Sequence, residues 1–334
     1  MPKSFDAIVD SISDIGFDWH KDNLISNSKN NLKYIKNTVL DLPKNNTSSA
    51  LIISAGPSLE KLKIIDELKT LDYSGQIIAI DATYIRLLKN NLIPDYILTL
   101  DPHPTRMIRW FGDYEFELNT KSDDYFERQD LDVHFRDNSI EQNSLNIKIV
   151  NKLSNRMKLI ICCTAPNNVV ERCIDAGFDL YWWAPIMDNP NNAYSLTREI
   201  HDITNLPCFN TGGNVGTAAW VFARTILNVE NIGIVGMDLG YFKDTPITET
   251  QTYYELQNIT DTEDQLNELF LDVKNPHNNI TYYTDPTYYW YKLNILQLLK
   301  SSNSKLFNCS GSGTLFGDGV EFMPLSSFVE KYNY

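Results

Sequence analysis

Short apolar runs alternate with amphipathic stretches along most of the chain after residue 46. The runs ALIIS, GQIIAID and YILTL have the length of strands, and a stretch whose apolar positions recur at helical spacing separates each from the next. Strands that alternate with helices are typical of a parallel sheet joined by right-handed crossovers. The pattern therefore predicts an α/β fold, a Rossmann-like and mostly parallel sheet with helices on both faces.

The first 42 residues follow a different pattern. Their apolar positions recur at approximately helical spacing, at Leu24, Leu32, Ile35, Val39 and Leu42. The polar stretch PKNNTSS then separates this segment from the first apolar run. We expect an N-terminal helical extension over residues 1–45, followed by the α/β domain over residues 46–334.

Residues 240–280 interrupt the alternation, because they are polar and acidic and hold few β-branched apolar runs. They predict a long excursion or lid, which extends to about residue 290. The tyrosine-rich stretch YYTDPTYYWY lies at its end. These rings can pack within the core and the lid, or they can stack on sugar rings, and both interpretations stay open.

The formal net charge of the 334 residues is −14. An acidic surface repels a phosphate backbone, so we expect no nucleic-acid partner, whereas a local pocket can still bind a small nucleotide. No stretch approaches the roughly 20 apolar residues of a membrane span, and the first residues contain no signal-like apolar region. The expected location is the cytoplasm. The five cysteines form no CxxC pair, so we expect buried thiols and no zinc site.

Candidate chemistry lies beyond the carboxyl ends of the predicted strands, where open α/β sheets bind their ligands. Gly56, Pro57 and Ser58 follow the first strand. Gly56 lets the backbone approach a ligand closely, and Ser58 can cap the next helix, whose free N–H groups would face an anion. A purely structural turn needs the same residues, so both interpretations remain.

Polar residues follow the later strands as well. Asp81, with Thr83 nearby, can cap a helix or contact a ribose or base. Asp101 is well placed to meet a ligand or a metal ion, and His103 can act as an acid or base because its pKa lies near neutrality. Asp238 ends the buried run IGIV, where an acid is more informative than on the surface.

A second glycine-rich turn enters a helix at Thr211, Gly212, Gly213 and Asn214. Its backbone N–H groups can cradle an oxyanion or a base. Close packing between a helix and a sheet explains the same glycines equally well.

The segments LIISAGPSLEKL, GQIIAIDATYIRLLKNNLIPDYILTLDPHP and TGGNVGTAAWVFARTILNVENIGIVGMDLGYF follow one another in that order. Together they resemble the MptE-like family and, within it, the motility accessory factor (Maf) proteins, which look like flagellin glycosyltransferases. The resemblance implies a transferase with a nucleotide-activated, CMP-linked donor similar to CMP-sialic acid, a protein or glycan acceptor, and no required cofactor.

Bacterial CMP-sialic-acid transferases show the same order of motifs. By that resemblance Gly56, Pro57 and Ser58 would lie beside the phosphate, and Asp81 and Thr83 would contact the nucleotide. The cytidine would be held at Gly212, Gly213 and Asn214. Those transferases have a catalytic histidine shortly before the penultimate helix, where this chain reads TYYTDPTYYWYK. The candidate bases are therefore Asp285, His277 and His103.

Two alternatives remain beside this function. The other branch of the family implies a diphosphokinase of the 6-hydroxymethylpterin type, which would use ATP and Mg²⁺ with Asp81, Asp101 and Asp238 as available metal ligands. A non-catalytic nucleotide-binding protein is the third possibility. The sequence also predicts that Gly56→Val abolishes nucleotide binding and leaves the fold intact.

Overall fold

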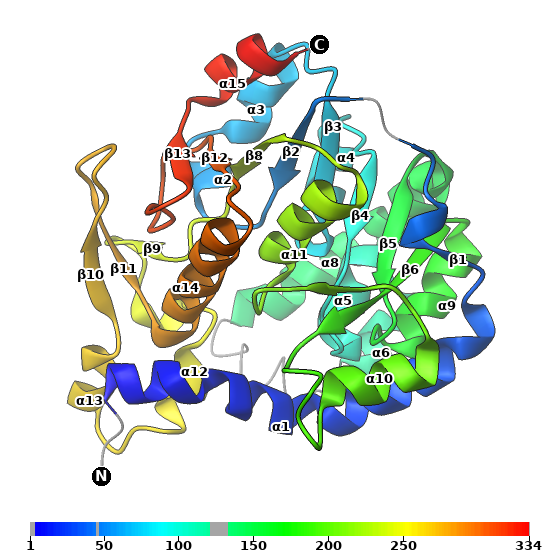
Figure 1. Cartoon of the computed structure of the whole chain (residues 1–334), viewed down its shortest axis with the longest axis horizontal. Helices are drawn as coiled ribbons and strands as arrows, with labels where there is room; N and C mark the ends of the chain where they lie inside the picture. Colours follow the sequence, from blue (N-terminus) through cyan, green and yellow to red (C-terminus); the bar gives the residue numbers. More distant parts are fainter. Residues whose placement is uncertain (1–3, 45–46, 121–132, 334) are drawn as a thin grey trace. The chain divides into compact units, whose positions relative to one another are not determined.

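Parallel strands form the core of each of the two units into which the chain divides (Figure 1). The computed structural model describes residues 4–44, 47–120 and 133–333. The first unit comprises Met1–Trp19, Thr47–Gly75 and Val229–Tyr334, and the second comprises His20–Asn46 and Gln76–Asn228.

In the first unit, parallel strands pair in the order β2-β8-β12-β13. Their bounds are β2 Ser49–Ile53, β8 Asn231–Val235, β12 Leu306–Asn308 and β13 Val320–Phe322. Gly233 of β8 leaves space for α15 (Leu325–Tyr332), because an added Cβ would lie 3.1 Å from the ring of Phe328. The buried strands and the aromatic face of α15 form the core of this unit.

A smaller antiparallel sheet in the same unit has the order β10-β11-β9. It comprises β9 Tyr241–Phe242, β10 Leu271–Lys274 and β11 Thr281–Thr284. The unit's helices are α2 Ser58–Lys61, α3 Ile64–Thr70, α12 Tyr253–Gln257, α13 Glu263–Glu268 and α14 Pro286–Ser301. The polar segment that predicts an excursion thus contains regular structure, anchored where Leu256, Leu266 and Leu269 pack on Ile8 of the N-terminal helix.

In the second unit, parallel strands pair in the order β1-β6-β5-β4-β3, and β7 also pairs with β6. Their bounds are β1 Asn37–Thr38, β3 Gln76–Ile80, β4 Tyr96–Leu98, β5 Lys158–Cys162, β6 Asp179–Ile186 and β7 Cys208–Asn210.

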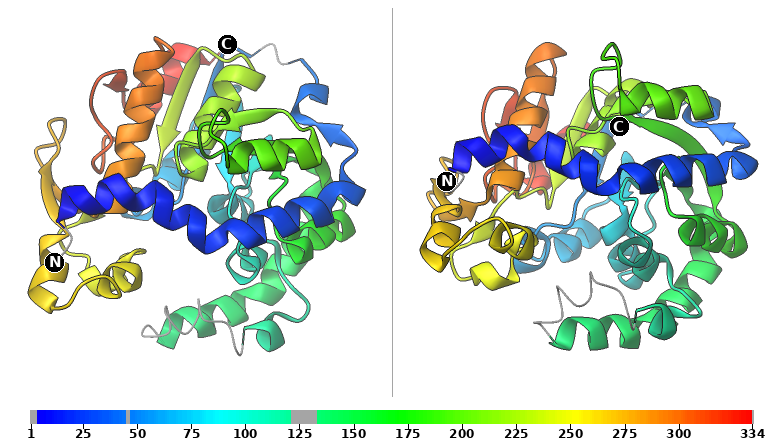
Figure 2. Two further views of the ribbon diagram at one scale, coloured as in Figure 1. Left: turned by 60° about the horizontal axis from the view of Figure 1, so that its bottom comes forward. Right: turned by 90° about the horizontal axis from the view of Figure 1, so that it is seen from below.

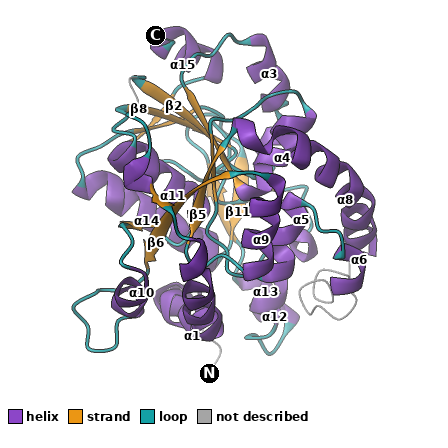
Figure 3. Ribbon diagram, turned by 90° about the vertical axis from the view of Figure 1, so that its right-hand side faces the viewer, coloured by secondary structure: helices purple, strands orange, loops and turns teal. Residues whose placement is uncertain are grey.

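Helices flank these strands on both sides, as Figure 3 shows for α4, α5 and α9 on one side and α10 and α11 on the other. The helices are α4 Asp81–Lys89, α5 Pro104–Phe111, α6 Phe116–Asn119, α8 Val133–Leu153, α9 Asn167–Ala176, α10 Leu196–Thr204 and α11 Val215–Val221. The prediction of an α/β fold built on mostly parallel strands is confirmed.

The N-terminal helix, α1, spans Phe5–Asn31 and is shorter than predicted. After it the chain turns through Leu32–Tyr34, and β1 pairs with Tyr181 and Trp182 of β6. The prediction that the helix continues to residue 42 is therefore wrong, because Asn37 and Thr38 form a strand that pairs with β6, which is distant in the sequence. The side chain of Asn31 donates to the carbonyl oxygens of Cys163 and Ala165 over 2.9 and 2.8 Å, which fixes the helix end on the second unit.

The C-terminal part of α1 runs beside α10 (Figure 2). Residues of both helices line a shallow hollow of about 440 Å³. Among the described residues, no helix has the length and hydropathy to cross a membrane.

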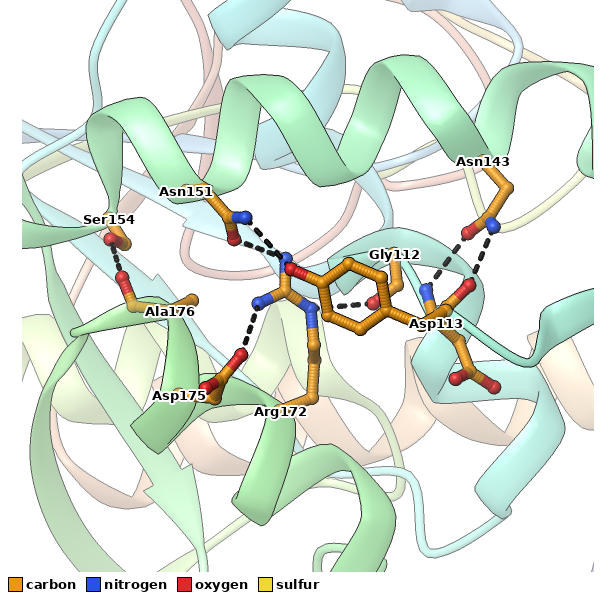
Figure 4. A network of polar contacts seen from close by, with 9 residues as sticks. Gly112, Asp113, Asn143, Asn151, Ser154, Arg172, Asp175 and Ala176 are labelled. Atoms are coloured by element: carbon orange, nitrogen blue, oxygen red, sulfur yellow. Dashed lines mark hydrogen bonds and ion pairs between the residues drawn. The ribbon is translucent and has the colours of Figure 1, made fainter.

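A buried arginine joins three elements of the second unit (Figure 4). Arg172 of α9 is 6% exposed. Its guanidinium donates to the carbonyl oxygen of Gly112, at the end of α5, and to Oδ1 of Asn151 in α8, both over 2.7 Å. A buried charge is tolerated only with such partners, so Arg172 fixes how α5, α8 and α9 pack.

Candidate functional site

Loops of the first unit meet at the carboxyl ends of β2, β8 and β12. Gly56 donates its N–H to the carbonyl oxygen of Gly236 over 2.6 Å, and Thr314 donates its N–H to the carbonyl oxygen of Asp238 over 2.7 Å. We call this cluster the strand-end junction, and it comprises residues 54–58, 236–239 and 312–314. The junction lies where a parallel α/β sheet is expected to bind its ligand.

Asp238 is the buried acid of the junction, with 2% of its surface exposed. Its Oδ2 accepts the backbone N–H of Ser58 over 2.7 Å. Burial raises the pKa of Asp238 to about 6, although the Ser58 backbone N–H and the hydroxyls of Ser58 and Ser312 lower it. The charge of this carboxyl therefore changes close to neutral pH.

Three polar atoms at the junction have no hydrogen-bond partner of normal geometry among the described residues. They are the hydroxyl oxygens of Ser54 and Ser58 and Oδ1 of Asp238. Buried polar groups are almost always hydrogen-bonded, and leaving one unpaired costs about 1–3 kcal/mol. Buried polar atoms without a partner are often found at functional sites, where a ligand can supply the hydrogen bond.

Ser58 does not cap the following helix, contrary to the sequence-based expectation. Pro57 is the N-cap residue of α2, and its side chain makes no hydrogen bond to the N–H groups of the helix. The carboxylate of Asp238, 180 residues further along the chain, takes that place. A phosphate that binds at Ser58 N–H therefore has to displace this carboxylate or meet it protonated.

Gly56 is required by packing. An added Cβ would lie 2.5 Å from the carbonyl oxygen of Gly236 and 2.6 Å from Oδ2 of Asp238. The expectation that Gly56→Val leaves the fold intact is therefore wrong, because valine collides with backbone and with a buried carboxylate. The groups close to Gly56 belong to the protein itself, so the approach of its backbone to a ligand stays a prediction.

Asp285 lies next to the junction through its neighbour Thr284, whose hydroxyl donates to the carbonyl oxygen of Leu239 over 3.0 Å. Asp285 is completely buried and caps α14, with Oδ1 accepting the N–H of Tyr288 over 2.9 Å. Its Oδ2 has no hydrogen-bond partner of normal geometry in the described residues, although the hydroxyl of Thr252 lies close enough to lower the pKa of Asp285. Burial raises the pKa of Asp285 to about 6.

His277, also in the first unit, lies beside Asn275 and Phe322. Its backbone N–H donates to Oδ1 of Asn275 over 2.8 Å, and its ring lies 5.2 Å from the ring of Phe322. The buried amide of Asn275 donates to the carbonyl oxygens of Gly311 and Gly313 over 3.1 and 2.9 Å. Sequence reasoning did not single out Asn275 or Ser312, although the run SGSGT after the last buried strand was a usable signal.

Asp81 and Asp101 form an acidic pair in the second unit, at the ends of β3 and β4. Burial, and after it the charge of Asp101, raises the pKa of Asp81 to about 7, although Arg106 opposes the shift. Asp101 itself is held by the guanidinium of Arg106 at 3.2 Å and accepts the backbone N–H of His103 over 2.8 Å. His103 caps α5, with its ring nitrogen Nδ1 accepting the N–H of Arg106 over 3.3 Å.

The remaining predicted residues of this unit make internal hydrogen bonds. The hydroxyl of Thr83 donates to the carbonyl oxygen of Ile80 over 3.1 Å. In the glycine-rich turn, Gly213 donates its N–H to the hydroxyl of Thr211 over 3.1 Å, and Asn214 caps α11. Gly212 and Gly213 have positive φ angles of 54° and 86°, which favour glycine. The turn is thus closed on itself.

The candidate residues therefore gather in two groups. Gly56, Pro57, Ser58, Asp238 and Asp285 lie together in the first unit, and Asp81, Asp101 and His103 lie together in the second. In the parts of the chain that the structure describes, no three His, Cys, Asp or Glu side chains form a metal-binding group.

A protein-family model matches a part of the chain that contains residues of both units. Residues 22–115, which hold the first glycine loop and the pair Asp81 and Asp101, match the family described as 6-hydroxymethylpterin diphosphokinase MptE-like. No curated protein matches the sequence.

A Maf glycosyltransferase from Magnetospirillum magneticum AMB-1 has a similar structure, with a TM-score of 0.55 and 15% sequence identity. The alignment covers 91% of this chain and 38% of that protein, so this chain spans well under half of the length of its structural relative. The predicted resemblance to MptE-like proteins and to the Maf fold is confirmed, and at this identity the structural likeness concerns the fold alone.

Proposed function

We propose, from the match of residues 22–115 to the MptE-like family and from a fold shared with a Maf glycosyltransferase, that this chain transfers a sugar from a nucleotide-activated donor. The observation that carries the proposal is the set of buried polar atoms that lack a hydrogen-bond partner of normal geometry at the strand-end junction, on Ser54, Ser58 and Asp238. They lie where parallel sheets bind nucleotides, and a ligand that supplies hydrogen bonds there removes their energetic cost.

In this proposal the donor phosphate meets Gly56, Pro57 and Ser58. The carboxylate of Asp238 already occupies the N–H of Ser58, so an arriving phosphate requires Asp238 to take up a proton. Uptake is cheap near neutral pH, because burial raises the pKa of Asp238 to about 6. Donor binding is thereby coupled to the protonation of one buried acid.

Asp285 is our preferred base, ahead of His277 and His103. Its Oδ2 has no partner of normal geometry, and its raised pKa of about 6 suits proton acceptance near neutrality. The acceptor hydroxyl gives its proton to Asp285, and its oxygen forms the new bond to the sugar carbon. The bond from that carbon to the phosphate oxygen breaks, and the nucleotide leaves with the electron pair.

The resemblance to CMP-sialic-acid transferases makes a CMP-linked donor our first choice, and a protein or glycan such as flagellin the acceptor. The reaction needs no cofactor in this form.

A specific observation favours a second function, the transfer of diphosphate from ATP. The carboxylates Asp81 and Asp101 lie close enough for the charge of one to raise the pKa of the other. A divalent cation stabilises such a pair, and Mg²⁺ is held by carboxylates together with substrate phosphates. The family description of residues 22–115 also names a diphosphokinase.

A thermal-shift screen with CMP, CDP, UDP and ATP, each with and without Mg²⁺, separates these functions. A ligand that binds the folded state raises the melting temperature according to its concentration relative to Kd. Stabilisation by cytidine nucleotides without metal supports sugar transfer. A shift with ATP and Mg²⁺ alone rejects sugar transfer in favour of diphosphate transfer. If cytidine nucleotides bind but no transfer to any acceptor is measured, the third possibility, a non-catalytic nucleotide-binding protein, is correct.

A further inference from the structure

Residues of α1 and α10 line a hollow of about 440 Å³ in the second unit, where the two helices run side by side (Figure 2). Lys21 and Lys29 of α1 form one wall, and the first turns of α10 form the other together with residues 193–195 of the loop before it. The volume lies within the range of small-molecule sites. None of the lining residues has a role in the proposed sugar transfer, so the hollow is a candidate for a separate site.

Both walls of the hollow lie at the carboxyl edge of the parallel strands of this unit. The loop before α10 begins directly after Ile186, the last residue of β6. On the other wall, the amide of Asn27 in α1 donates to the carbonyl oxygen of Thr164, just beyond the end of β5, over 2.9 Å. The strands β5 and β6 are parallel neighbours. The hollow is therefore located where a sheet of this kind is expected to bind a ligand.

Tyr194 presents its ring at this hollow. The side chain is 96% exposed, whereas Leu40, the next most exposed large apolar residue of the described part of the chain, is 70% exposed. Single exposed apolar residues are common on protein surfaces, so the exposure alone indicates nothing. What distinguishes Tyr194 is the way in which its loop is held.

Hydrogen bonds fix the backbone on both sides of Tyr194. The carboxylate of Asp188 accepts the hydroxyl of Ser195 over 2.7 Å, and the guanidinium of Arg198 donates to the carbonyl oxygen of Ala193 over 3.2 Å. Ser195 and Ala193 are the immediate neighbours of Tyr194 in the sequence. The ring is thus displayed from an ordered backbone, which lowers the entropic cost of binding a ligand.

Charged groups of both signs line the hollow beside this ring. Lys21 and Lys29 supply ammonium groups from α1, and Glu199 and Asp202 supply carboxylates from α10. Within the described part of the chain, these four side chains make no hydrogen bond or ion pair with one another or with other residues. Donors that only donate and acceptors that only accept therefore lie free on opposite walls.

An anionic ligand fits this set of groups poorly. Glu199 and Asp202 repel it, and the whole chain carries a formal net charge of −14. A neutral sugar fits better, because each of its hydroxyls both donates and accepts and so pairs with ammonium and carboxylate groups alike. The apolar C–H face of the sugar ring packs on an aromatic face such as that of Tyr194.

We propose that the hollow between α1 and α10 is a glycan-binding site, in which a neutral sugar unit stacks on Tyr194 and its hydroxyls pair with the charged side chains of both helices. The open shape of the hollow suits one unit of a longer glycan, whose remaining units extend into solvent. The inference does not rest on the proposed function, because it uses none of the residues assigned to sugar transfer.

Saturation-transfer NMR on the wild-type chain tests the class of ligand. The neutral probes are lactose, chitobiose and mannobiose, and a heparin disaccharide is the acidic probe. We expect at least one neutral disaccharide to receive saturation from the protein and the heparin disaccharide to receive none. No signal from any neutral disaccharide, or a signal from the heparin disaccharide alone, overturns the inference.

Variants place the bound sugar. Tyr194→Ala is expected to weaken binding of the disaccharide about fivefold or more, because the stacking face is lost. Tyr194→Phe keeps the ring and is expected to bind within about twofold of wild type. Asp202→Ala, which removes one acceptor, is expected to weaken binding about threefold. Leu40→Ala is the control, since it removes an exposed apolar side chain that does not line the hollow.

The outcomes separate this inference from the proposed function. Affinity for the disaccharide that is unchanged in Tyr194→Ala shows that the sugar binds elsewhere, and the inference is then wrong whatever the transfer activity. Binding that depends on Tyr194 in a chain that binds no nucleotide and transfers no sugar supports the glycan site and rejects the proposed function.

Discussion

The carboxylate Oδ2 of Asp238 accepts the backbone N–H of Ser58 over 2.7 Å, which joins the loop after β8 to the loop after β2. The N–H group that the sequence predicts for a phosphate is thus occupied by an acid of the protein itself. Because burial raises the pKa of that acid to about 6, the contact is sensitive to pH in the physiological range. Phosphate binding and the charge of Asp238 must then oppose each other.

The raised pKa of Asp238 also makes the free energy of unfolding depend on pH. The folded-state pKa of Asp238 lies above its ordinary value of 3.8, so the folded protein holds this proton to higher pH than the unfolded chain. Stability is therefore lost as the pH rises from about 4 to about 6. Asp238→Asn keeps an oxygen for the N–H of Ser58 and removes the charge. We expect this variant to have a higher melting temperature than wild type at pH 7.5 and a similar one at pH 4.

Asp285→Asn separates the structural role of Asp285 from its proposed chemistry. Asparagine caps a helix about as well as aspartate, and it removes a buried acid whose pKa burial raises to about 6, so the variant is expected to be at least as stable as wild type at pH 7.5 and to bind CMP normally. As a lost general base, it is expected to reduce sugar transfer about 100-fold or more. Asp285→Ala, which also lacks the cap to Tyr288, should lose about 1 kcal/mol of stability in addition. Full transfer activity in Asp285→Asn assigns the base to another residue.

Arg172→Met tests the packing of the second unit apart from its chemistry. The variant leaves the carbonyl oxygen of Gly112 and the amide of Asn151 without their buried donor. We expect a loss of about 2–4 kcal/mol in the free energy of unfolding, measured by urea denaturation. Arg156→Met is the control, since Arg156 is exposed and should change stability by less than about 0.5 kcal/mol. An equal effect of both variants would show that the buried network contributes nothing.

Asp101→Asn tests the acidic pair and, with it, the diphosphate-transfer alternative. The charge of Asp101 is the second cause, after burial, of the raised pKa of Asp81. The variant should therefore lower the pKa of Asp81 below its value of about 7, as followed by carboxyl carbon NMR shifts during a pH titration. It should also abolish any Mg²⁺-dependent effect of ATP on the melting temperature. An unchanged pKa of Asp81 would mean that burial alone causes the shift.

The alternation of strands and helices was predictable because each element depends on nearby residues. The strand β8 and the helix α14, for example, follow directly from the runs IGIV and YYWYKLNILQLL. The end of α1 at Asn31 was not predictable, since it depends on the pairing of β1 with β6 about 140 residues later.

The candidate site shows the same limit. Ser58 and Asp238 were each identified from their places after strands, but the contact between them joins residues 180 positions apart. The predicted domain boundary near residue 45 stays a prediction.

The affinity for CMP as a function of pH, compared between wild type and Asp238→Asn by titration calorimetry, tests the central claim most directly. The ionisation of the CMP phosphate changes with pH in the same way in both experiments, so the difference in affinity between the two proteins reports on Asp238. We predict that Asp238→Asn binds CMP roughly 30-fold more tightly than wild type at pH 7.5, because wild type must first take up a proton on a group of pKa about 6, and that the two affinities converge near pH 5. Equal affinities at both pH values, or no CMP binding by either protein, would contradict a phosphate site at Ser58 that competes with Asp238.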